Sequence, residues 1–454
     1  MADTQLMEKI VSLCKRRGFI FPGSEIYGGL AGTWDYGPYG VALRNNIKNL
    51  WWKEFVDGRE DMYGVDAAIL MNQNVWKASG HVGGFNDPLV EDIKTKKRYR
   101  ADHLLEDAGL NPKGMTAQQM DALIKEKNLK SPDGNQLGDV RQFNMMFATK
   151  AGAADDESAT VYLRPETAQG MFVNFKNIID TFHPRLPFGM GQIGKAFRNE
   201  IAPGNFIFRL RELEQMEIEY FVKPDAWKES FDEFLALQKK FLLSLGLPES
   251  KIHQVEIPEA DRAHYSKWSV DTEFDFPIGQ KELLGIAYRT DYDLNAHKES
   301  SKVDLSYFDE ETKERYVPHC VEPTFGLDRL MLATLSSAYD EETVNDELRT
   351  VLRFPTNVAP VKIAVLPLSK KEELGRPARE IVKVLSMFGK VEYDETQSIG
   401  KRYRRQDEIG TPYCVTVDFD TLEDQAVTVR DRDTMKQDRI KIADLPTYFQ
   451  GKLG

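Results

Sequence analysis

The sequence predicts a mixed α and β protein built from two or three domains. Its 454 residues exceed the length of one ordinary domain and are enough to bury a substantial core. Segments typical of strands alternate with segments typical of helices from residue 143 to residue 333. After the stretch FPTNVAP (354–360), a second alternation of short strands and helices begins. We therefore expect a large domain over 1–354 and a smaller α/β domain with an open mixed sheet over 355–454.

The composition is that of an ordinary soluble globular protein, with 41% hydrophobic and 29% charged residues. Sixty Lys and Arg against 72 Asp and Glu give a net charge of −12, which argues against a protein that coats DNA or RNA indiscriminately. Cys14, Cys320 and Cys414 show no CxxC spacing, so we expect reduced thiols and no zinc site. No apolar run approaches the roughly 20 residues of a membrane span, and Asp3 and Glu8 disfavour a transit peptide. A cytoplasmic protein without a membrane partner is expected.

The N-terminal region predicts two helices separated by a loop rich in glycine and tyrosine. Leu6, Ile10 and Leu13 have helical spacing, and the loop YGGLAGTWDYGPYG follows them. In ALRNNIKNLWWKEFV, apolar residues from Leu43 to Phe55 form the stripe of a second helix, and VDAAILMNQNVW is expected to be a strand. Around 101–140, polar turns such as SPDGNQLGD interrupt short helical pieces, which indicates a small insertion on the surface of the large domain.

The last domain is predicted from four β-rich runs and two helical stretches. The runs are VKIAVLPL, KVEYD, PYCVTVDF and QAVTVRDR, and the helices are KKEELGRPAREIVKVLSMF and a segment around GKRYRRQDEIG. GKRYRR (400–405) is a basic cluster in an acidic chain. Contact with RNA phosphates, with Tyr403 available for stacking, and a solvated helix start are equally favoured for it.

GMGQIG (189–194) matches the G-x-G-x-x-G pattern of dinucleotide-binding loops. Such a loop needs a buried strand before it and a helix after it. Here TFHPRLPF, with two prolines, precedes the glycines, and the charged stretch FRNEI follows them. We expect the glycines to allow close backbone packing at the entry of a strand.

The most unusual segment is FRNEIAPGNFIFRLRELEQMEIEYF (197–221), in which charged residues are interspersed with apolar ones. It predicts one strand at FRNEI, a tight connection at APGN, and a long returning strand over the remainder. Two-residue periodicity places Phe208, Leu210, Glu212, Glu214 and Met216 on one face and Arg209, Arg211, Leu213, Gln215 and Glu217 on the other. Taken alone, the pattern also fits a solvated sheet face with cross-strand ion pairs.

Three further segments embed lone acids and arginines among glycines and apolar residues. They are RPETAQG (164–170), KELLGIAYRTDYDL (281–294) and EPTFGLDR (322–329). Buried charges are costly unless they are paired or bound to a ligand. We therefore interpret the four segments as one site for a polyionic ligand, with arginines for phosphates and acids for a cationic group and a metal.

Together these segments resemble class II aminoacyl-tRNA synthetases, and in particular the homodimeric glycyl-tRNA synthetases. FRNE with its return strand is similar to motif 2 of that family, and GLDR before an apolar helix is similar to motif 3. WKASGH, FNMMF, EQMEIEYF, YDLNAH and VTVRDRDT are further glycyl-type signatures, so the resemblance covers nearly the whole chain. It implies an α+β fold, with an antiparallel sheet flanked by helices as catalytic domain and a C-terminal α/β anticodon-binding domain.

The resemblance also implies the reaction. Glycine and ATP would form glycyl-adenylate and pyrophosphate, and the glycyl group would then move to the 3′ end of tRNA(Gly). Mg²⁺ would be the cofactor, and two copies of the chain would form a homodimer. No covalent enzyme intermediate is required, since positioning and charge neutralisation promote the displacement at phosphorus.

By motif position, Arg198 would hold the α-phosphate and the glycine carboxylate, and Glu200 would accept a hydrogen bond from the adenine amino group. Arg209 would reach the γ-phosphate, Arg329 would lie over the adenine face, and Glu282 would bind magnesium. We assign Arg198, Glu200 and Arg329 as the catalytic residues. The implied ATP contacts are Arg198, Asn199, Glu200, Phe208, Arg209, Leu210, Arg211, Glu212, Leu213, Glu282, Leu283, Gly326, Leu327, Asp328 and Arg329.

For glycine, the resemblance implies an ammonium cradle of Glu166, Glu217 and Glu322, with Arg100 as a further substrate contact. Larger amino acids would be excluded by filled side-chain space, so no editing site is needed. The implied glycine contacts are Arg100, Glu166, Leu213, Glu214, Gln215, Met216, Glu217, Glu322, Pro323, Thr324, Phe325 and Gly326.

The sequence departs from the family pattern at three places. Leu213 stands where motif 2 usually has the phenylalanine that stacks on adenine. Thr324 stands in place of the usual serine and adds a methyl group close to the glycine pocket. The proline of motif 1 is not visible after WWKEFV, where MNQN stands instead, so the dimer interface is predicted from the helix alone.

Two other functions are compatible with this type of fold. A synthetase-like binding protein, such as the accessory subunit of the mitochondrial DNA polymerase, would not require Arg198, Glu200, Glu282 and Arg329, which are all present. A synthetase for another amino acid, for example proline or threonine, is disfavoured by RPETAQG and EQMEIEYF.

Overall fold

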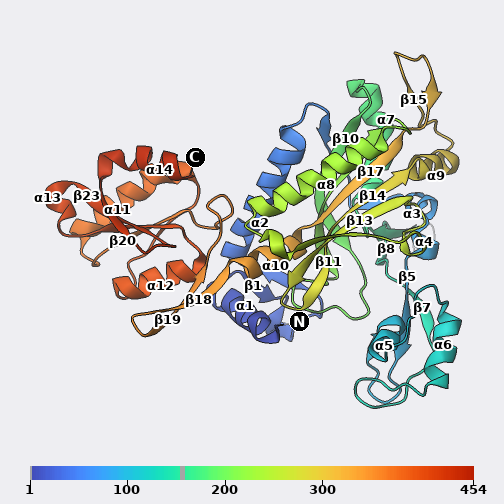
Figure 1. The fold of residues 1–454 in the computed structure, drawn as a ribbon, viewed down its shortest axis with the longest axis horizontal. Helices are drawn as coiled ribbons and strands as arrows, with labels where there is room; N and C mark the ends of the chain where they lie inside the picture. The colour runs from blue at the N-terminus through green and yellow to red at the C-terminus, as the bar shows by residue number, and fades with distance from the viewer. Residues whose placement is uncertain (1–2, 154–158, 454) are drawn as a thin grey trace.

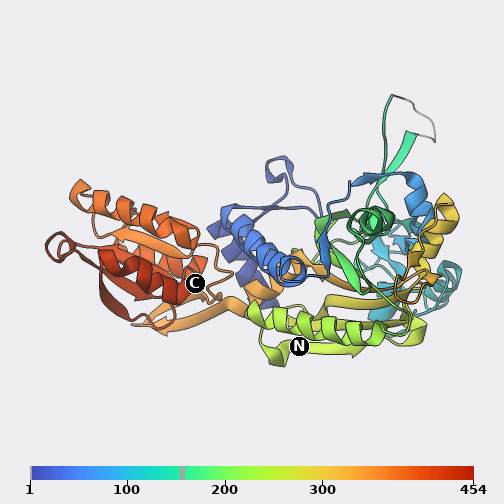
Figure 2. The same ribbon diagram turned by 90° about the horizontal axis from the view of Figure 1, so that it is seen from above.

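The computed structural model describes residues 3–153 and 159–453, which form two lobes (Figure 1). The larger lobe contains the central sheet and its helices, with a small appended subdomain. The smaller lobe contains a second sheet and the C-terminal helix, and Figure 2 shows it beside the larger lobe. Within the described residues, no helix is both long and apolar enough to cross a membrane.

The larger lobe is organised around a seven-stranded sheet of order β12-β13-β14-β17-β11-β10-β3. Its strands in chain order are β3 (Met62–Gly64), β10 (Phe188–Phe197), β11 (Glu212–Val222), β12 (Ile252–Glu256), β13 (Trp268–Phe276), β14 (Gly279–Thr290) and β17 (His319–Gly326). All neighbours are antiparallel except β3, which runs parallel to β10. β11 lies inside the sheet, and most of its residues are buried on both faces.

Helices cover both faces of this sheet. One group shares the main hydrophobic core: α1 (Thr4–Arg17), α2 (Pro38–Trp52, continued by a π-helical segment at Lys53–Asp57), α8 (Trp227–Ser244) and α10 (Leu327–Ala338). On the other face, α7 (Ala168–Phe182) and α9 (Tyr292–Ser301) contribute to a second core that includes Phe188 and Phe221.

Shorter elements complete the larger lobe. The strands are β1 (Ile20–Pro22), β2 (Trp34–Tyr36), β4 (Leu70–Met71), β8 (Ala148–Lys150), β9 (Thr160–Leu163), β15 (Tyr307–Phe308) and β16 (Arg315–Tyr316). The helices are α3 (Gln73–Ala78) and α4 (His81–Gly84).

A small subdomain projects from the larger lobe (Figure 1). It consists of β5 (Asn86–Glu91), β6 (Arg98–Arg100), β7 (Arg141–Asn144), α5 (Ala101–Asp107) and α6 (Ala117–Glu126). A core of its own, with Val90, Leu105, Met120 and Ile124, holds these elements together. The region that we predicted as an insertion, about 101–140, lies within this subdomain, and β5 and β6 extend the subdomain towards the N-terminus.

The smaller lobe contains the predicted mixed sheet, of order β21-β20-β22-β23-β24. The hairpin β18 (Tyr339–Val344) and β19 (Glu347–Leu352) precedes it, and its elements are β20 (Ile363–Pro367), α11 (Glu372–Leu385), β21 (Val391–Tyr393), α12 (Ile399–Ile409), β22 (Tyr413–Val417), α13 (Thr421–Asp424), β23 (Ala426–Asp431), β24 (Gln437–Lys441) and α14 (Leu445–Leu453). β20 is parallel to β21 and β22, whereas β23 and β24 are antiparallel. α11 and α14 pack on one face of the sheet and α12 on the other.

Several local predictions need correction. FRNEI is not a strand, because β10 ends at Phe197, and the returning strand begins only at Glu212. The intervening residues form a loop with one isolated bridge, Gly204 to Arg209, since hydrogen bonds to other loops replace strand pairing there. VDAAILMNQNVW holds only the short β4, after which the Asn72 side chain caps α3 by accepting from the Asn74 amide. EPTFGLDR is the end of β17 and runs directly into α10, the apolar helix expected after GLDR.

The glycines of GMGQIG lie inside β10, and their environment confirms close packing. A Cβ atom on Gly194 would lie 2.2 Å from Arg164 Nη2, and one on Gly191 would lie 2.8 Å from a methyl carbon of Val56. A side chain at either position would therefore force its neighbour to move. No dinucleotide-binding loop is formed here, since the segment is a regular strand.

Candidate active site

A cleft of about 280 Å³ brings together the β10–β11 loop, the ends of β14 and β17, and the start of α10. Many of the predicted site residues line it, namely Arg100, Arg198, Glu200, Phe208, Arg209, Leu210, Leu213, Glu214, Gln215, Glu282, Leu283, Thr324, Gly326, Asp328 and Arg329. The lining also includes four residues that were not predicted: Met145, Ile207, Leu284 and Gly285.

Strand register explains why distant segments meet at this cleft. Glu217 of β11 pairs with Thr324 of β17, and Thr324 pairs with Gly285 of β14. Alternate residues of a strand point to the same face, so Gln215 and Glu217 lie on the side opposite Met216, which is buried in the main core. The predicted two-residue periodicity is confirmed for 212–217. It does not extend to 208–211, because those residues belong to the loop.

Arginines line the β10–β11 side of the cleft. Arg198 follows the end of β10, its Nε donates to the carbonyl oxygen of Pro165 at 3.0 Å, and its guanidinium lies 5.6 Å from the centre of the Phe85 ring. In the described part of the chain its terminal nitrogens have no protein acceptor, so they are available to an anionic ligand. Arg100, from the small subdomain, reaches the cleft while paired with Asp87 and Asp102.

Glu200 and Arg329 supply a hydrogen-bond acceptor and a flat surface. Glu200 Oε2 is buried and has no hydrogen-bond donor among the described residues, so it can accept from a ligand. The Arg329 guanidinium lies 4.5 Å from the centre of the Phe208 ring, and its Nη1 donates to the Glu282 carbonyl oxygen at 3.0 Å. These contacts hold Arg329 in place at the entrance of α10.

Carboxylates at one rim of the cleft fit a hard cation. Glu282 pairs with Glu273 across β13 and β14, next to a bulge. Burial, followed by the charges of Glu282 and Glu273, raises the pKa of Asp271 to about 7. No group of three or more metal-ligating side chains is found in the described residues. Mg²⁺ usually binds through one or two carboxylates together with substrate phosphates, and this rim offers such a donor set.

Next to the cleft lies a buried pocket of acids, which contains the predicted Glu166, Glu217 and Glu322. Glu217 accepts from the Thr167 amide at 3.0 Å and from Gln215 Nε2 at 2.7 Å. Glu166 accepts from Gln169 Nε2 at 3.0 Å, and its Oε2 lies 3.3 Å from His81 Nε2. The three carboxylates come from the RPETAQG, EQMEIEYF and EPTFGLDR segments, as predicted.

Arg289 is the main cation of this pocket and was missed as a site residue. It is 1% exposed, and two of its nitrogens donate to Asp293 at 2.8 Å. Its Nη1 donates to Glu322 Oε1 at 2.7 Å, and its guanidinium lies 3.8 Å from the centre of the Tyr265 ring. The sequence contained a signal for it. Arg289 precedes Asp293 by four residues within YRTDYDL, a segment already chosen for its embedded charges.

The pocket contains more carboxylates than cations, and the pKa values reflect this. Burial, followed by the charge of Glu166, raises the pKa of Glu217. Burial raises the pKa of Glu322 to about 8, even though Arg289 opposes it. Burial also acts on Glu166, but His81 and Arg289 outweigh it and lower the pKa of that carboxyl. A cationic ligand group would pair with these carboxylates and favour their charged forms.

Other predicted residues point away from the cleft. The main-chain amide of Asn199 donates to the Met145 carbonyl oxygen at 2.7 Å. Glu212 forms an ion pair with Lys195 at 2.8 Å. Arg211 donates to the carbonyl oxygens of Ala31 at 2.7 Å and Glu200 at 3.1 Å. Arg211 therefore ties the β1–β2 loop to the β10–β11 loop instead of lining the cleft.

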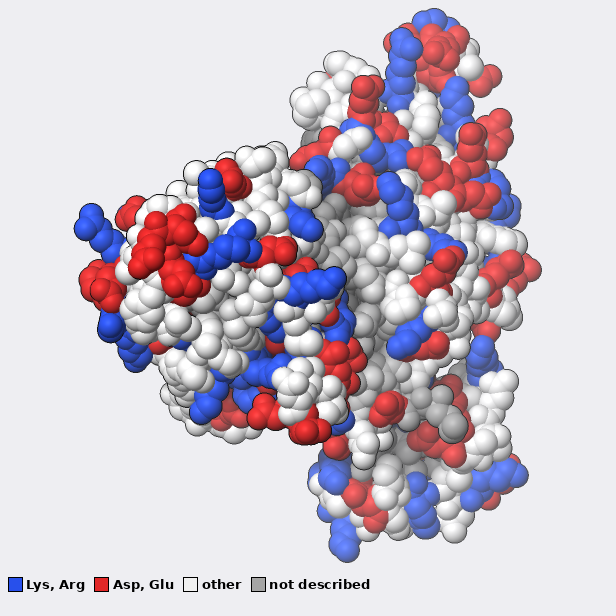
Figure 3. Space-filling view, turned by 60° about the vertical axis from the view of Figure 1, so that its left-hand side comes forward, with Lys and Arg blue, Asp and Glu red and all other residues white. Residues whose placement is uncertain are grey.

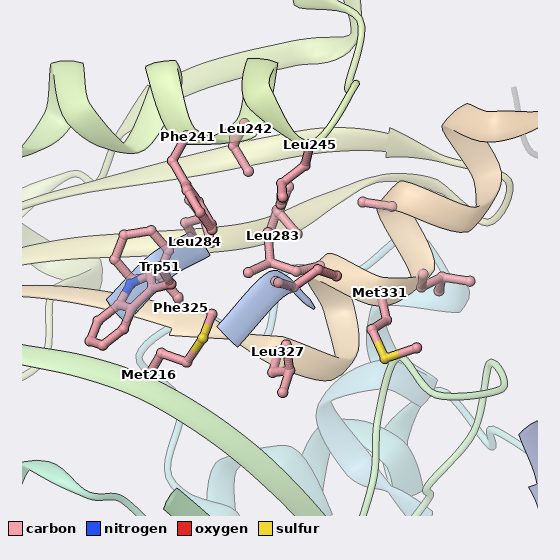
Figure 4. Close-up of a cluster of buried hydrophobic side chains, with 14 of the residues drawn as sticks. Trp51, Met216, Phe241, Leu242, Leu245, Leu283, Leu284, Phe325, Leu327 and Met331 are labelled. Carbon is pink, nitrogen blue, oxygen red and sulfur yellow. The ribbon is translucent and has the colours of Figure 1, made fainter. Parts of the chain in front are cut away.

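Several predicted residues, among them the cleft-lining Leu283, Glu214 and Asp328, have side chains that are held by other parts of the protein. Met216, Leu283, Phe325 and Leu327 have their side chains in the main core (Figure 4), and Pro323 is buried within β17. Glu214 and Asp328 both pair with Arg44 of α2, and Asp328 also accepts from the Glu214 amide at 2.9 Å. These residues contribute backbone and rigidity to the cleft, and their side chains are already engaged.

Two protein-family models match the chain. Residues 147–338 match the tRNA synthetase class II core domain (G, H, P, S and T), and residues 362–452 match the anticodon binding domain. The chain is 55% identical to the glycine–tRNA ligase of Acetivibrio thermocellus over 100% of this chain and 99% of that protein. The chain belongs to the glycine–tRNA ligase family. The glycine–tRNA ligases of Bacillus anthracis and Alkaliphilus oremlandii are each 53% identical, over 98% and 100% of this chain and 99% and 100% of those proteins.

Membership of this family confirms the expected fold class, a class II synthetase core followed by an anticodon-binding domain. It also confirms the enzyme class, an ATP-dependent aminoacyl-tRNA ligase whose amino acid is glycine. A synthetase-like binding protein and a prolyl or threonyl enzyme are both disfavoured by identity of this extent.

The basic run at 400–405 is only partly exposed: Lys401 faces solvent, while other members are engaged within the domain. Arg402 is 1% exposed and donates to the carbonyl oxygens of Pro367 and Asp394, and Tyr403 packs against the sheet with its hydroxyl 2.6 Å from Thr416 Oγ1. Arg405 pairs with Asp394. Tyr403 is therefore not free for base stacking, and much of the cluster holds α12 in place. Over the lobe facing the viewer in Figure 3, basic and acidic side chains lie side by side.

Proposed function

We propose that the cleft and the acidic pocket together activate glycine and transfer it to the 3′ end of tRNA(Gly). A glycine carboxylate oxygen attacks the α-phosphorus of ATP, the bond to pyrophosphate breaks, and glycyl-adenylate forms. A terminal hydroxyl of tRNA then attacks the glycyl carbonyl carbon, and AMP leaves. The observation that carries the proposal is the cluster of Glu166, Glu217 and Glu322, whose charges act on one another. Glu322 also lines a second cleft, which shares Glu282, Gly285 and Thr324 with the arginine-lined cleft.

In the nucleotide cleft, Arg198 bridges the α-phosphate and the glycine carboxylate, so attacker and target stay together. Glu200 accepts from the adenine amino group, which its unpartnered buried oxygen supports. Arg329 covers the adenine face, and Arg209 lies in the connection between β10 and β11, where it reaches the γ-phosphate. Glu282 would hold Mg²⁺, with Asp271 and Glu273 near it, and the ion would supply positive charge that offsets the phosphates.

In the acidic pocket, Glu166, Glu217 and Glu322 cradle the glycine ammonium. Arg289 fixes the Glu322 carboxylate through Nη1, and Thr324 lies beside Glu217 across the strands. The space that a larger substrate side chain would need is filled by the protein, so larger amino acids clash and are excluded. Glycine therefore needs no separate editing site.

We further propose the division into a catalytic domain, 1–354, with an insertion that includes about 101–140, and an anticodon-binding domain, 355–454. Residues 353–362 support the boundary, because they connect the β18–β19 hairpin to the second sheet. We also propose a cytoplasmic homodimer. The interface was predicted from the helix that contains WWKEFV. The apolar stripe of that helix, Leu43, Ile47, Trp51 and Phe55, is fully buried in the chain's own core, so only its other faces are available to a partner copy.

Exchange of labelled pyrophosphate into ATP, measured with each amino acid in turn, tests this function. Glycine is expected to be the preferred substrate by a wide margin. Faster exchange with alanine, serine, proline or threonine would point to another synthetase. Absence of exchange with every amino acid would favour a binding protein without chemistry.

The affinity for glycine is expected to increase between about pH 6 and about pH 8. Glu322 has its pKa raised to about 8, so it is largely protonated in the free protein at neutral pH, and the glycine ammonium favours its ionised form. Binding therefore releases a proton, and the affinity rises with pH until Glu322 is ionised without ligand. The charged groups facing Glu322 are Arg289, Asp293, Glu166, Glu217 and Glu219.

Isothermal titration calorimetry in two buffers of different ionisation enthalpy measures this proton release directly. Equal binding heats in both buffers, together with a pH-independent affinity, would contradict the prediction. The Glu322→Gln variant is expected to bind glycine more weakly and with a smaller proton release.

Replacing Leu213 by phenylalanine is expected to lower the KM for ATP about threefold to tenfold. Leu213 lines the cleft and stands where the family pattern places a stacking ring, and base–aromatic stacking is worth roughly 1–3 kcal/mol relative to alanine. Exchange kinetics at varied ATP concentration measure the effect. Leu213→Met adds length without a ring, so an equal gain in that variant would show that size, not stacking, is responsible.

A further inference from the structure

A buried network of ion pairs lies at the connection between the two lobes. None of its members was assigned to the chemistry described above. Arg349 of β19 is fully buried, and its Nε donates to Asp407 Oδ2 of α12 at 2.8 Å. Its other nitrogens donate to Glu342 and, at 2.6 Å, to the carbonyl oxygen of Arg432. Asp407 is 1% exposed and also accepts from Arg430 at 2.9 and 3.2 Å.

The members of this network lie on the connection between the lobes and on the smaller lobe. Arg349 and Glu342 lie on the β18–β19 hairpin, which begins at Tyr339 directly after α10. Asp407 and Arg430 both lie in the smaller lobe, so their pair is internal to that lobe. Arg349 therefore connects the helix that begins beside the cleft to the sheet of the anticodon-binding domain.

Neighbouring contacts show that α12 is docked tightly. Glu408 pairs with Arg17 of α1 and lies 3.3 Å from Arg16. At the end of α12, a Cβ atom on Gly410 would lie 2.5 Å from the Phe354 ring, so the backbones approach closely. Breaking a buried ion pair by removing one partner leaves an uncompensated charge, whereas exposed pairs contribute little. A substitution of Arg349 is thus the best test of what fixes the position of the smaller lobe.

We propose that Arg349 is a positioning residue for the tRNA step. It fixes the smaller lobe relative to the cleft, so that a tRNA held through its anticodon presents its 3′ end to glycyl-adenylate. This inference rests on the proposed function, because it requires tRNA as a ligand shared by both lobes. Two binding regions of a protein can hold one ligand at the same time, and so raise the affinity for it, only if the distance between the regions matches the ligand. Activation of glycine uses the larger lobe alone and does not depend on that distance.

The test compares two activities of the full-length Arg349→Met variant. Methionine removes the guanidinium but leaves the Asp407–Arg430 pair inside the smaller lobe. We expect kcat/KM for charging of tRNA(Gly) to fall about tenfold or more, while glycine-dependent pyrophosphate exchange stays within about twofold of the wild type. Arg353→Met is the matched control. Arg353 pairs with Asp340 of β18 at 2.8 Å and with Asp433 of the smaller lobe at 3.1 Å. Its side chain is 29% exposed, so both activities should stay within about twofold of the wild type.

A second variant separates positioning from the burial of an excess negative charge. Asp407 keeps Arg430 as its partner in Arg349→Met, but the network of Glu342, Asp407 and Arg430 then holds one negative charge too many. Adding Asp407→Asn restores the charge balance while the connection is still missing, so charging should remain low. Recovery of charging in this variant would overturn the proposal, as would unchanged charging, or an equal loss of charging and exchange, in Arg349→Met. Lack of glycine-dependent exchange in the wild-type protein would overturn the proposed function instead.

Discussion

Replacing Arg198 by alanine is expected to lower the rate of glycine-dependent pyrophosphate exchange by at least about 10³-fold. Removing one donor to developing charge typically costs about 10²–10³ in kcat. Arg198 would in addition lose the bridge between the glycine carboxylate and the α-phosphate, which keeps the reacting atoms in place. Exchange kinetics at saturating ATP and glycine measure the loss.

Two observations make the Arg198 result interpretable. Arg198→Lys keeps a charge but loses the planar fork, so it should recover only part of the activity. The only direct protein acceptor of the Arg198 side chain among the described residues is the Pro165 carbonyl oxygen, so thermal unfolding of Arg198→Ala should stay close to that of the wild type. Exchange within about tenfold of the wild type, in a folded variant, would remove Arg198 from its assigned role.

Replacing Arg289 by methionine is expected to destabilise the protein by about 3–5 kcal/mol and to abolish measurable glycine binding. The substitution leaves Asp293 and Glu322 buried without their cation. Without the opposing charge of Arg289, burial raises the folded-state pKa of Glu322 further above the unfolded value. Its charged form destabilises the fold as pH rises, so the loss should be larger near pH 7 than near pH 4.

Urea unfolding of Arg289→Met at both pH values measures the effect. Arg289→Met combined with Asp293→Asn should recover part of the stability, because one buried charge is neutralised. It should not recover glycine binding, since Glu322 would still lack its partner. A destabilisation of less than about 1 kcal/mol in the single variant would show that water or a local rearrangement compensates the carboxylates.

The sequence predicted the segments of the active site better than the direction of each side chain. Motif position identified the cleft residues Arg198, Glu200 and Arg329, which the fold brings together from the β10–β11 loop and α10. Motif position selects consecutive residues, so it does not tell which of them face the cleft and which face the core. Met216 and Phe325 were included with Gln215 and Thr324, yet strand alternation turns them into the main core.

The errors at 197–211 have a common physical cause. Alternation of charged and apolar residues predicts a strand only if the backbone finds a neighbouring strand. Here the Arg198 amide donates to the Arg211 carbonyl oxygen. Arg211 in turn donates to Glu200 in the same loop and to the carbonyl oxygens of Gly32 and Ala31 in the β1–β2 loop. The acceptors in the β1–β2 loop lie about 180 residues away in the chain. Arg289 was missed for a similar reason, because its role depends on Glu322, which comes from another strand.

The small subdomain that carries β5, β6 and β7 has a hydrophobic core separate from the core of the larger lobe. Units with their own core can unfold locally, at a lower free energy than the whole protein. Arg100 and Asp87 lie on this subdomain, and Arg100 lines the cleft. Local unfolding of this subdomain would therefore remove Arg100 from the cleft while the central sheet is still intact.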